Sequence, residues 1–332
     1  MKKRILISGC GGFVASHLIN YILKEHKDCE IAGIYRRHGV NSLQRLDEFG
    51  TRNKIKLYEG DLTSYNRVWQ ILNDFQPDII FHLAAQSFVR ISWETPEHTL
   101  TNNTIGQLNI FEAVRELNLK PVIMIAGSSE EYGMVKPEEC PMKETNPLRP
   151  LSPYGVSKIA QDKMAYQYYK SYGLRTVITR AFNHSGISRG TEFVCSAFAT
   201  QLADIVVNNK KPVIKVGNLE AERDFTDVRD MVRAYWLAVH ECDYGTSDNI
   251  GTGKAYKISD VLNTLIKISG IKNLVVEQDE KLMRPSDVPL LLADATKFKK
   301  ATDWKPEISF EKMLEDQYNY CVKKIGGFNS QV

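Results

Sequence analysis

Short runs of apolar residues alternate with helix-length amphipathic segments over the first half of this chain. The runs carry almost continuous Ile, Val and Leu, which is typical of parallel strands buried on both faces. They predict strands at residues 4–9, 31–35, 79–85, 121–127 and 176–182. The amphipathic segments predict helices at residues 13–25, 64–74, 97–117 and 153–172. Ser64 and Pro153 are start signals for two of these helices. Such alternation indicates an α/β fold with a doubly wound parallel sheet, the Rossmann arrangement.

The second half of the chain follows a looser pattern in which helices, short strands and prolines mix. We expect residues 1–184 to form a dinucleotide-binding domain, with returns to its sheet near 225–253. Residues 185–224 and 254–332 then form a smaller, interleaved C-terminal lobe that binds the substrate. With 332 residues and 43% hydrophobic content, the chain can bury the core of one large domain or of two closely joined ones.

Charge and cysteine usage exclude several classes of protein. The 43 Lys and Arg residues exceed the 40 Asp and Glu residues by three, and the densest basic cluster, Arg36–Arg37, is too short for a nucleic-acid-binding surface. No apolar run approaches the ~20 residues of a membrane span. The six cysteines form no C-x-x-C pair, which argues against a zinc site and a disulfide framework. We therefore expect a cytoplasmic protein with reduced thiols, no bound metal, and no nucleic-acid or membrane partner.

The stretch "SGCGGFVASHL" follows the first expected strand and opens the first expected helix. Gly9 suits the tight turn, Gly12 lets the backbone approach a pyrophosphate, and Ala15 is the small residue that packs helix on strand. The helix N-terminus at Phe13 and Val14 faces the phosphates with free N–H groups and a favourable dipole. A plain glycine turn is the alternative, but the position between strand and helix favours a dinucleotide site.

The second expected strand ends in "IYRRHG", without the acidic residue that an NAD site uses to hold the ribose hydroxyls. Arg36 and Arg37 offer two guanidinium groups that suit a 2′-phosphate, so the sequence predicts NADP as the cofactor. A solvated basic turn is the alternative. In "GDL", Asp61 can accept a hydrogen bond from the adenine amino group or cap the next helix, with Leu62 beside it.

Small residues follow another strand in "HLAAQS", where they let the backbone pass close to a cofactor. The contacts predicted there are Leu83, Ala84, Ala85 and Ser87. We expect His82 to be a packed strand residue rather than a ligand.

Tyr154 and Lys158 are four residues apart in an expected helix, so they lie on one face, one turn apart. The pKa of a free phenol is near 10. A nearby ammonium favours the phenolate and lowers that pKa, so Tyr154 can act as an acid or base at neutral pH. Lys158 can also bond a nicotinamide ribose. Alone, this spacing is common by chance, but together with Ser128 at a strand end and a phosphate-binding loop it is a strong signal.

The set "SGCGGF", "GDL", "HLAAQS", "SSEEYG" and "YGVSK" resembles the extended short-chain dehydrogenase/reductase superfamily over nearly the whole chain. The resemblance implies that Ser128 hydrogen-bonds a sugar O4, that Tyr154 takes or gives its proton, and that Lys158 supports Tyr154. Glu130 is placed as the additional acid/base that a 4,6-dehydratase needs, although a salt-bridged carboxylate is the alternative. We expect strand alternation to send Glu131 to the opposite face.

Three stretches resemble the GDP-mannose 4,6-dehydratase group within this superfamily: "GIYRRHGVNSLQRL", "SWETPEHTL" and "FNHSGISRGTEFV". The NADP contacts that this resemblance implies are Arg36, Arg37, His184 and Arg189. The substrate contacts that it implies are Ser87, Asn183, Val194, Arg223 and Arg284, the two last as a clamp on the diphosphate. The glycine loop "CGGFVAS" and His98 depart from the group's usual pattern.

The sequence therefore predicts NADP-dependent 4,6-dehydration of a GDP-sugar, GDP-mannose, to GDP-4-keto-6-deoxy-mannose. Other stretches, such as "LRPLSPYGVSK", resemble GDP-4-keto-6-deoxy-mannose reductases, and GDP-heptose dehydratases match about as well. The double-arginine loop and Arg189 favour the dehydratase. Helices 97–117 and 153–172 resemble a pair that forms a four-helix dimer interface, and loop 36–45 resembles one that makes dehydratases tetrameric. A homodimer or homotetramer is therefore expected.

Overall fold

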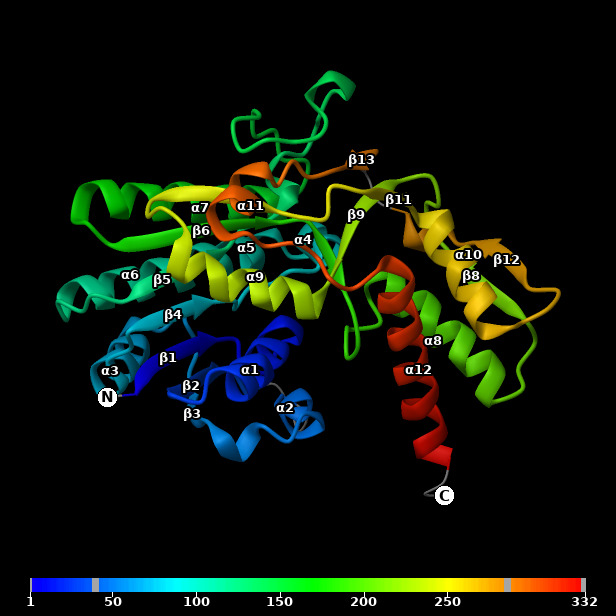
Figure 1. The fold of residues 1–332 in the computed structure, drawn as a ribbon, viewed down its shortest axis with the longest axis horizontal. Coiled ribbons are helices and arrows are strands. Elements are labelled where there is room, and N and C mark those ends of the chain that lie inside the picture. The colour runs from blue at the N-terminus through cyan, green and yellow to red at the C-terminus, as the bar shows by residue number, and fades with distance from the viewer. Residues whose placement is uncertain (1, 38–41, 284–287, 330–332) are drawn as a thin grey trace.

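The computed structural model describes residues 2–37, 42–283 and 288–329. Its larger part is built on a seven-stranded sheet in which all neighbouring strands are parallel (Figure 1). The strand order is β10 (Thr246–Ile250), β6 (Arg175–Ala181), β5 (Val122–Ala126), β4 (Ile79–His82), β1 (Lys3–Ser8), β2 (Cys29–Tyr35) and β3 (Lys56–Glu59). The strand order reverses between β1 and β4: β2 and β3 follow on one side of β1, and β4, β5 and β6 on the other. Sheets of this kind bind ligands at such a switch point. The prediction of a doubly wound parallel sheet is confirmed.

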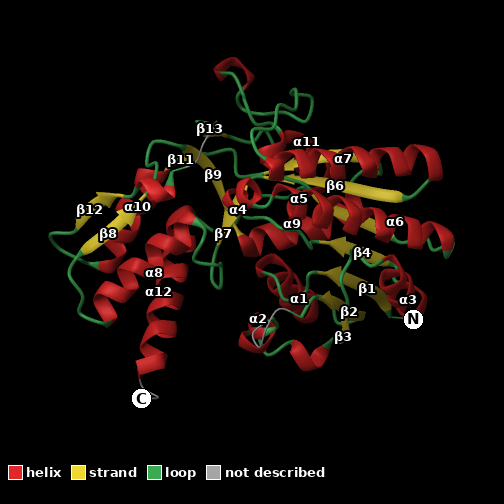
Figure 2. Ribbon diagram, turned by 180° about the vertical axis from the view of Figure 1, so that it is seen from behind, coloured by secondary structure: helices red, strands yellow, loops and turns green. Residues whose placement is uncertain are grey.

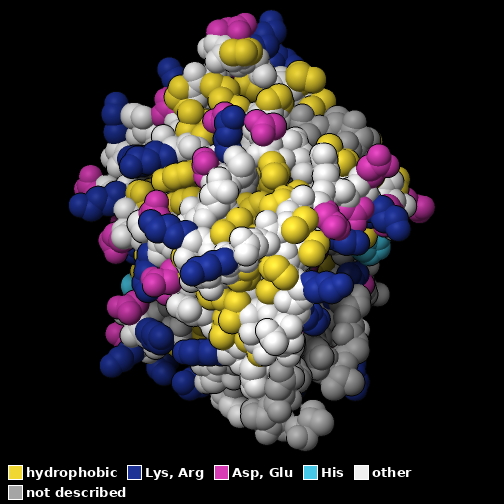
Figure 3. Space-filling model, turned by 90° about the vertical axis from the view of Figure 1, so that its right-hand side faces the viewer, with side chains coloured by type: hydrophobic (Ala, Val, Ile, Leu, Met, Phe, Trp, Pro, Cys, Tyr) yellow, Lys and Arg dark blue, Asp and Glu magenta, His cyan; other side chains and the backbone are white. Residues whose placement is uncertain are grey.

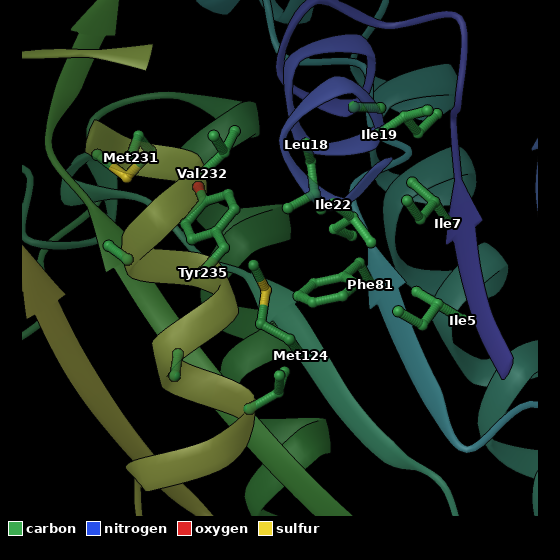
Figure 4. Close-up of a cluster of buried hydrophobic side chains, with 14 of the residues drawn as sticks. Ile5, Ile7, Leu18, Ile19, Ile22, Phe81, Met124, Met231, Val232 and Tyr235 are labelled. Atoms are coloured by element: carbon green, nitrogen blue, oxygen red, sulfur yellow. The ribbon is translucent and has the colours of Figure 1, made fainter. Parts of the chain in front are cut away.

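Helices cover both faces of this sheet because its strands are apolar on both sides. One face packs against α1 (Phe13–Glu25), α9 (Val228–Glu241) and α11 (Thr296–Thr302). The other face packs against α3 (Tyr65–Phe75), α6 (Gly106–Glu116) and α7 (Pro153–Tyr172). Figure 4 shows the first core, where Phe81 and Met124 of the sheet face Leu18 and Ile22 of α1 and Tyr235 of α9.

Short helical turns connect these elements. They are α2 (Gln44–Glu48), α4 (Val89–Glu94), α5 (Pro96–Leu100), η1 (Arg52–Lys54), the π-helical turn η2 (Thr101–Ile105), η3 (Ser129–Glu131), η4 (Pro137–Glu139) and η5 (Glu280–Leu282). Helices α1 and α7 have the predicted bounds. The prediction of a single helix at 97–117 is wrong in one respect, because η2 divides this segment into α5 and α6. Within η2 the Asn103 amide donates to the Gln86 carbonyl and to Ser157 Oγ, so polar contacts compete with the helical ladder there.

The second part of the structure has its own hydrophobic core between α8 (Val194–Val207), α10 (Ile258–Ser269) and α12 (Phe310–Asn329). Two small sheets accompany it: β7 (Asn183–Ser185), β9 (Glu222–Asp227), β11 (Ala255–Lys257) and β13 (Leu290–Leu291) in one, and β8 (Val213–Val216) with β12 (Val275–Gln278) in the other. Figure 2 shows this part beside the large sheet. Within the 254–332 segment expected to belong to the smaller lobe, Phe298 and Trp304 are buried in the core of the large sheet, because α11 packs on β10 and α9.

The outer face of the second part carries hydrophobic side chains along its middle, between charged ones (Figure 3). Val206 of α8 and Val275 of β12 are among the exposed apolar residues of this part. None of the helices that the structure describes is both long enough and apolar enough to span a bilayer.

A buried ion cluster joins β6 to α7 and to η3. Arg180 on β6 pairs with Asp162 of α7 at 3.0 Å and with Glu131 of η3 at 3.3 Å, and all three side chains are at most 3% exposed. Burial raises the pKa of Glu131, the Asp162 carboxylate raises it further, and Arg180 opposes both effects. A Glu131 oxygen also accepts the Ser128 N–H at 2.8 Å. The cluster therefore fixes the segment after β5 relative to α7.

We expect Arg180→Met to lower the free energy of unfolding by about 3–5 kcal/mol, because it removes the buried guanidinium that two buried carboxylates share. Arg115→Met is the matched control: Arg115 pairs with Glu112 at 2.6 Å, but its side chain is 47% exposed, so a loss of only ~0–1 kcal/mol is expected. Urea unfolding of both variants measures the difference. Equal losses would contradict a structural role for the cluster.

Candidate active site

A cavity of about 580 Å³ lies at the carboxyl ends of the parallel strands and extends to β7, α8 and β9 of the second part. With one exception, every predicted site residue in the described part of the chain lines it. They are Gly9, Gly12, Phe13, Val14, Arg36, Asp61, Leu62, Leu83, Ala84, Ala85, Ser87, Ser128, Glu130, Tyr154, Lys158, Asn183, His184, Arg189, Val194 and Arg223. The exception is Arg37, which is exposed and is not part of the lining. Arg284 lies outside the described residues.

The glycine loop brings the backbone against the floor of the cavity. Gly9 has φ +69°, and a Cβ atom there would lie 2.9 Å from the Ala84 Cα. Gly12 is the N-cap of α1 and has no side chain to bond the free N–H groups, and the first turn of α1 has no acidic residue. The positive end of the α1 dipole therefore faces the cavity without an internal counter-charge. This end of the cavity fits the pyrophosphate of a dinucleotide.

Arg36 lies at the far end of the cavity, after β2. Its Nη1 is 3.4 Å from Asp61 Oδ2 and 3.3 Å from Asn102 Oδ1, and its side chain is 37% exposed. Asp61 also accepts the N–H and the hydroxyl of Thr63, at 2.9 and 2.8 Å, while Ser64 is the N-cap residue of α3. Asp61 therefore closes the turn before α3 rather than capping the helix itself.

Arg45 is a lining residue to which sequence reasoning gave no role. Its Nε donates to the Ser188 carbonyl at 2.9 Å and its Nη1 to the Gly11 carbonyl at 3.4 Å. It thus ties α2 to the glycine loop and to the loop after β7. The stretch that resembles the dehydratase group includes Arg45, but its two partners are distant in sequence, and no local pattern signals them.

The chemical end of the cavity is set by the start of α7. Ser152 Oγ accepts the Gly155 N–H at 3.1 Å and Pro153 occupies the first helical position, so the helix begins just before Tyr154. Lys158 lies one turn later, with Nζ 5.7 Å from the centre of the Tyr154 ring. Tyr154, Lys158 and Ser128 therefore line one region of the cavity, as the spacing predicted.

Burial dominates the electrostatics of this region. It raises the pKa of Tyr154, and Glu130 and Glu131 add to the shift, while a hydrogen bond with Ser128 opposes it. Burial also lowers the pKa of Lys158 to about 8. The expectation of a lowered Tyr154 pKa is therefore wrong for the protein alone, because loss of solvent is the largest effect and raises it. A further cation bound beside Tyr154 would favour the phenolate.

The two neighbouring carboxylates have different environments. Glu130 is half-buried and lines the cavity, whereas Glu131 is fully buried against Arg180. Glu130 and Glu131 do lie in different environments, as predicted, but strand alternation is not the cause. Both residues belong to the 3₁₀ turn η3, in which successive side chains point about 120° apart. One carboxylate is thus available to a ligand while the other is used in the core.

Arg189 forms part of the wall opposite α7. Its guanidinium carbon lies 3.4 Å from the ring centre of Phe193 and 4.7 Å from that of Phe13. Burial lowers the pKa of Arg189 to about 10, and burial followed by the Arg189 charge lowers that of His184 to about 4. Within the described residues, Arg189 Nε and Asn183 Oδ1 are buried without a hydrogen-bond partner. Such atoms are suited to a polar ligand in the cavity.

Arg223 of β9 also reaches the cavity, although it is 6% exposed and donates to the Glu222 carbonyl at 2.9 Å. In the described ranges, no group of three or more His, Cys, Asp or Glu residues is arranged to hold a metal ion.

Comparison with known proteins supplies the family. The family model for GDP-mannose 4,6 dehydratase matches residues 6–317. The chain is 31% identical to the GDP-mannose 4,6-dehydratase of Vibrio cholerae serotype O1, over 100% of this chain and 99% of that protein. Two solved structures have 26% identity and cover 97% of the chain: RMD from Pseudomonas aeruginosa complexed with NADPH (TM-score 0.84, 100% of that chain) and Thermotoga maritima UDP-glucose 4-epimerase with UDP-glucose (TM-score 0.85, 99% of that chain).

Proposed function

The chain belongs to the GDP-mannose 4,6-dehydratase family, and on that premise we propose that it catalyses the NADP-dependent 4,6-dehydration of GDP-mannose. The reaction removes water from the hexose and leaves a 4-keto-6-deoxy sugar without net oxidation. The observation that carries this proposal is the position of Glu130, which lines the same cavity as Ser128, Tyr154 and Lys158. A reaction confined to C4 needs no such carboxylate, whereas dehydration requires a base for the C5 proton.

The residues of the cavity fit NADP. The N-terminus of α1 would hold the pyrophosphate, Arg36 the 2′-phosphate, Asp61 the adenine and Lys158 the nicotinamide ribose. Phe13, Val14, His184 and Arg189 supply further wall contacts. Bound NADP would supply the hydride acceptor and donor, and its oxidised ring would bring the positive charge that the buried Tyr154 lacks.

The side chains then divide the proton transfers. Tyr154, as phenolate, takes the proton of the sugar O4 while Ser128 hydrogen-bonds that oxygen and Lys158 stabilises the phenolate. The C4 hydride would pass to bound NADP, so that C4 becomes a ketone and the C5 proton becomes acidic. Glu130 takes this proton and returns it to the C6 hydroxyl, which leaves as water. Tyr154 then gives the proton that it took from O4 to C5, and the hydride would return from the cofactor to C6.

The sugar nucleotide would lie between the two parts of the structure. We assign Ser87 and Asn183 to the sugar end, Val194 to the wall beside it and Arg223 to the diphosphate, whose negative charge matches a guanidinium. On this proposal residues 1–184, with the return near 225–253, bind NADP. Residues 185–224 and 254–332, apart from α11, bind the GDP-sugar.

A second copy of the chain is the proposed protein partner. Apolar side chains remain exposed along and near α7: Ile105, Val156, Tyr166 and Tyr172 are 38–50% exposed. Pairing of this helix with its copy would bury them, so we propose a homodimer, with a homotetramer as the alternative through loop 36–45.

We expect Tyr166→Glu to convert this assembly to a particle with the 37.8 kDa mass of one chain, since it buries a charge in the interface. Light scattering on the purified protein measures the mass. Val275→Glu, at an exposed apolar position of β12, is the control and should leave the assembly intact. A wild-type protein with the mass of a single chain would refute the proposal.

The reaction type predicts where solvent hydrogen enters the product. GDP-mannose turned over in deuterated water should give a 4-keto-6-deoxy product with deuterium at C5, without NADPH accumulating in step with product. Glu130→Gln should lose ~10²–10⁴-fold in turnover, because the amide cannot take the C5 proton. Glu138→Gln, an exposed neighbour, should keep full activity. If GDP-mannose is inert, and the protein instead reduces a GDP-4-keto-6-deoxy sugar while consuming NADPH, the protein is a reductase and the dehydratase proposal is wrong.

Adjacent arginines offer a matched test of cofactor choice. Arg36→Ala should reduce the preference for NADP over NAD by about 10–100-fold, the worth of one charge-assisted hydrogen bond of ~1.5–3 kcal/mol. Arg37→Ala should change the preference much less, because Arg37 does not line the cavity. Values of kcat/KM with both cofactors measure this. An unchanged preference in Arg36→Ala would remove that residue from the 2′-phosphate site.

A further inference from the structure

A buried chain of hydrogen bonds leads away from Lys158. Lys158 Nζ donates to Gln161 Oε1 at 2.9 Å, and Gln161 Nε2 lies 3.2 Å from His82 Nε2. His82 Nδ1 in turn lies 2.9 Å from Ser8 Oγ. These four side chains come from α7, β4 and β1, and each is at most 3% exposed.

The charge of Lys158 fixes the orientation of the Gln161 amide. An ammonium only donates, so Gln161 must present its oxygen to Lys158 and its NH₂ group to His82. His82 Nε2 is then an acceptor, and His82 Nδ1 remains in hydrogen-bond contact with Ser8 Oγ at 2.9 Å. A doubly protonated His82 would face the Gln161 NH₂ with a second donor. Burial and the Lys158 charge lower the pKa of His82 to about 3, which keeps the ring neutral.

The far end of the chain reaches the wall of the cavity. Ser8 Oγ accepts the backbone N–H groups of Leu83 and Ala84, each at 3.1 Å. Both residues line the cavity on the side where the glycine loop approaches. The chain thus connects Lys158 with a second segment of the same site.

We propose that Gln161 and His82 are positioning residues that hold the Lys158 ammonium beside Tyr154 and tie it to the strand-end segment at Leu83 and Ala84. Lys158 Nζ also donates to the Ala126 carbonyl, at 2.8 Å. Without Gln161, the ammonium keeps that single bond to a neutral acceptor, at a position that is only 3% exposed. Its charged form then becomes less stable, and the support it gives to the Tyr154 phenolate weakens.

The charged and titratable groups around Lys158 leave room for such an effect. Glu131 of η3 is the carboxylate that favours the ammonium, and it is shared with Arg180 of β6. Tyr154 faces Lys158 from its own helix, and neutral His82 faces it from β4 through Gln161. The Gln161 amide is thus a principal neutral support of the charge.

The test measures Lys158 itself as well as turnover, because the role in catalysis rests on the proposed function. In protein labelled with ¹⁵N-lysine, the Lys158 signal is assigned by its loss in Lys158→Met and titrated with pH. Gln161→Met keeps the side-chain length but breaks both links, so the midpoint should fall by about one pH unit, the worth of one hydrogen bond to a charge. Gln161→Glu restores the acceptor with a negative charge, and the midpoint should rise above that of the wild type.

Gln107→Met is the matched control. Gln107 is also buried and donates its amide to the Gln161 backbone carbonyl at 2.8 Å, but it does not touch the chain of side chains. It should leave the midpoint unchanged, and the alkaline limb of kcat should move only in the two Gln161 variants, with KM for the sugar unaltered. A wild-type midpoint in Gln161→Met, or an equal fall in Gln107→Met, overturns the proposal. Shifted midpoints in a protein that does not turn over GDP-mannose would uphold the chain and reject the proposed function.

Discussion

The ion cluster around Arg180 is the constraint on which the geometry of the site depends. Arg180 holds one carboxylate from α7 and one from η3 in an interior without water, so the end of β5 and the start of α7 cannot move apart cheaply. Ser128 follows β5 directly and Tyr154 opens α7, and the Glu131 that pairs with Arg180 also accepts the Ser128 N–H. The distance between the hydroxyl and the phenol is thus fixed by charges placed behind them.

The same cluster explains how two adjacent glutamates acquire different roles. Glu131 is held by Arg180 in the core, and Glu130, one residue earlier in a 3₁₀ turn, is left at the cavity. An epimerase and a dehydratase share this fold. The chemistry is therefore decided by such individual side chains rather than by the sheet. On the proposed function, the half-buried carboxylate of Glu130 beside Tyr154 and Lys158 is the feature that would turn oxidation at one sugar carbon into loss of water from its neighbours.

Local signals in the sequence were sufficient for the elements that build the floor of the site. Pro153 and the glycine loop mark the starts of α7 and α1, and both helices have the predicted bounds because start signals and apolar periodicity agree there. Contacts between distant residues had no such signal. The π-helical turn at Thr101–Ile105, the bridge made by Arg45 and the return of α11 to the large sheet each depend on partners far along the chain. The pKa of Tyr154 was predicted in the wrong direction because spacing reveals the ammonium but not the burial.

In the proposed reaction, the hydride removed from one carbon of the hexose is returned to another carbon of the same molecule. GDP-mannose that carries deuterium at C4 tests this, with the product analysed by mass spectrometry and NMR. The label should be retained and should appear in the C6 methyl group, at a catalytic amount of NADP. Label that leaves the sugar with the reduced cofactor, or an intact substrate, would contradict it.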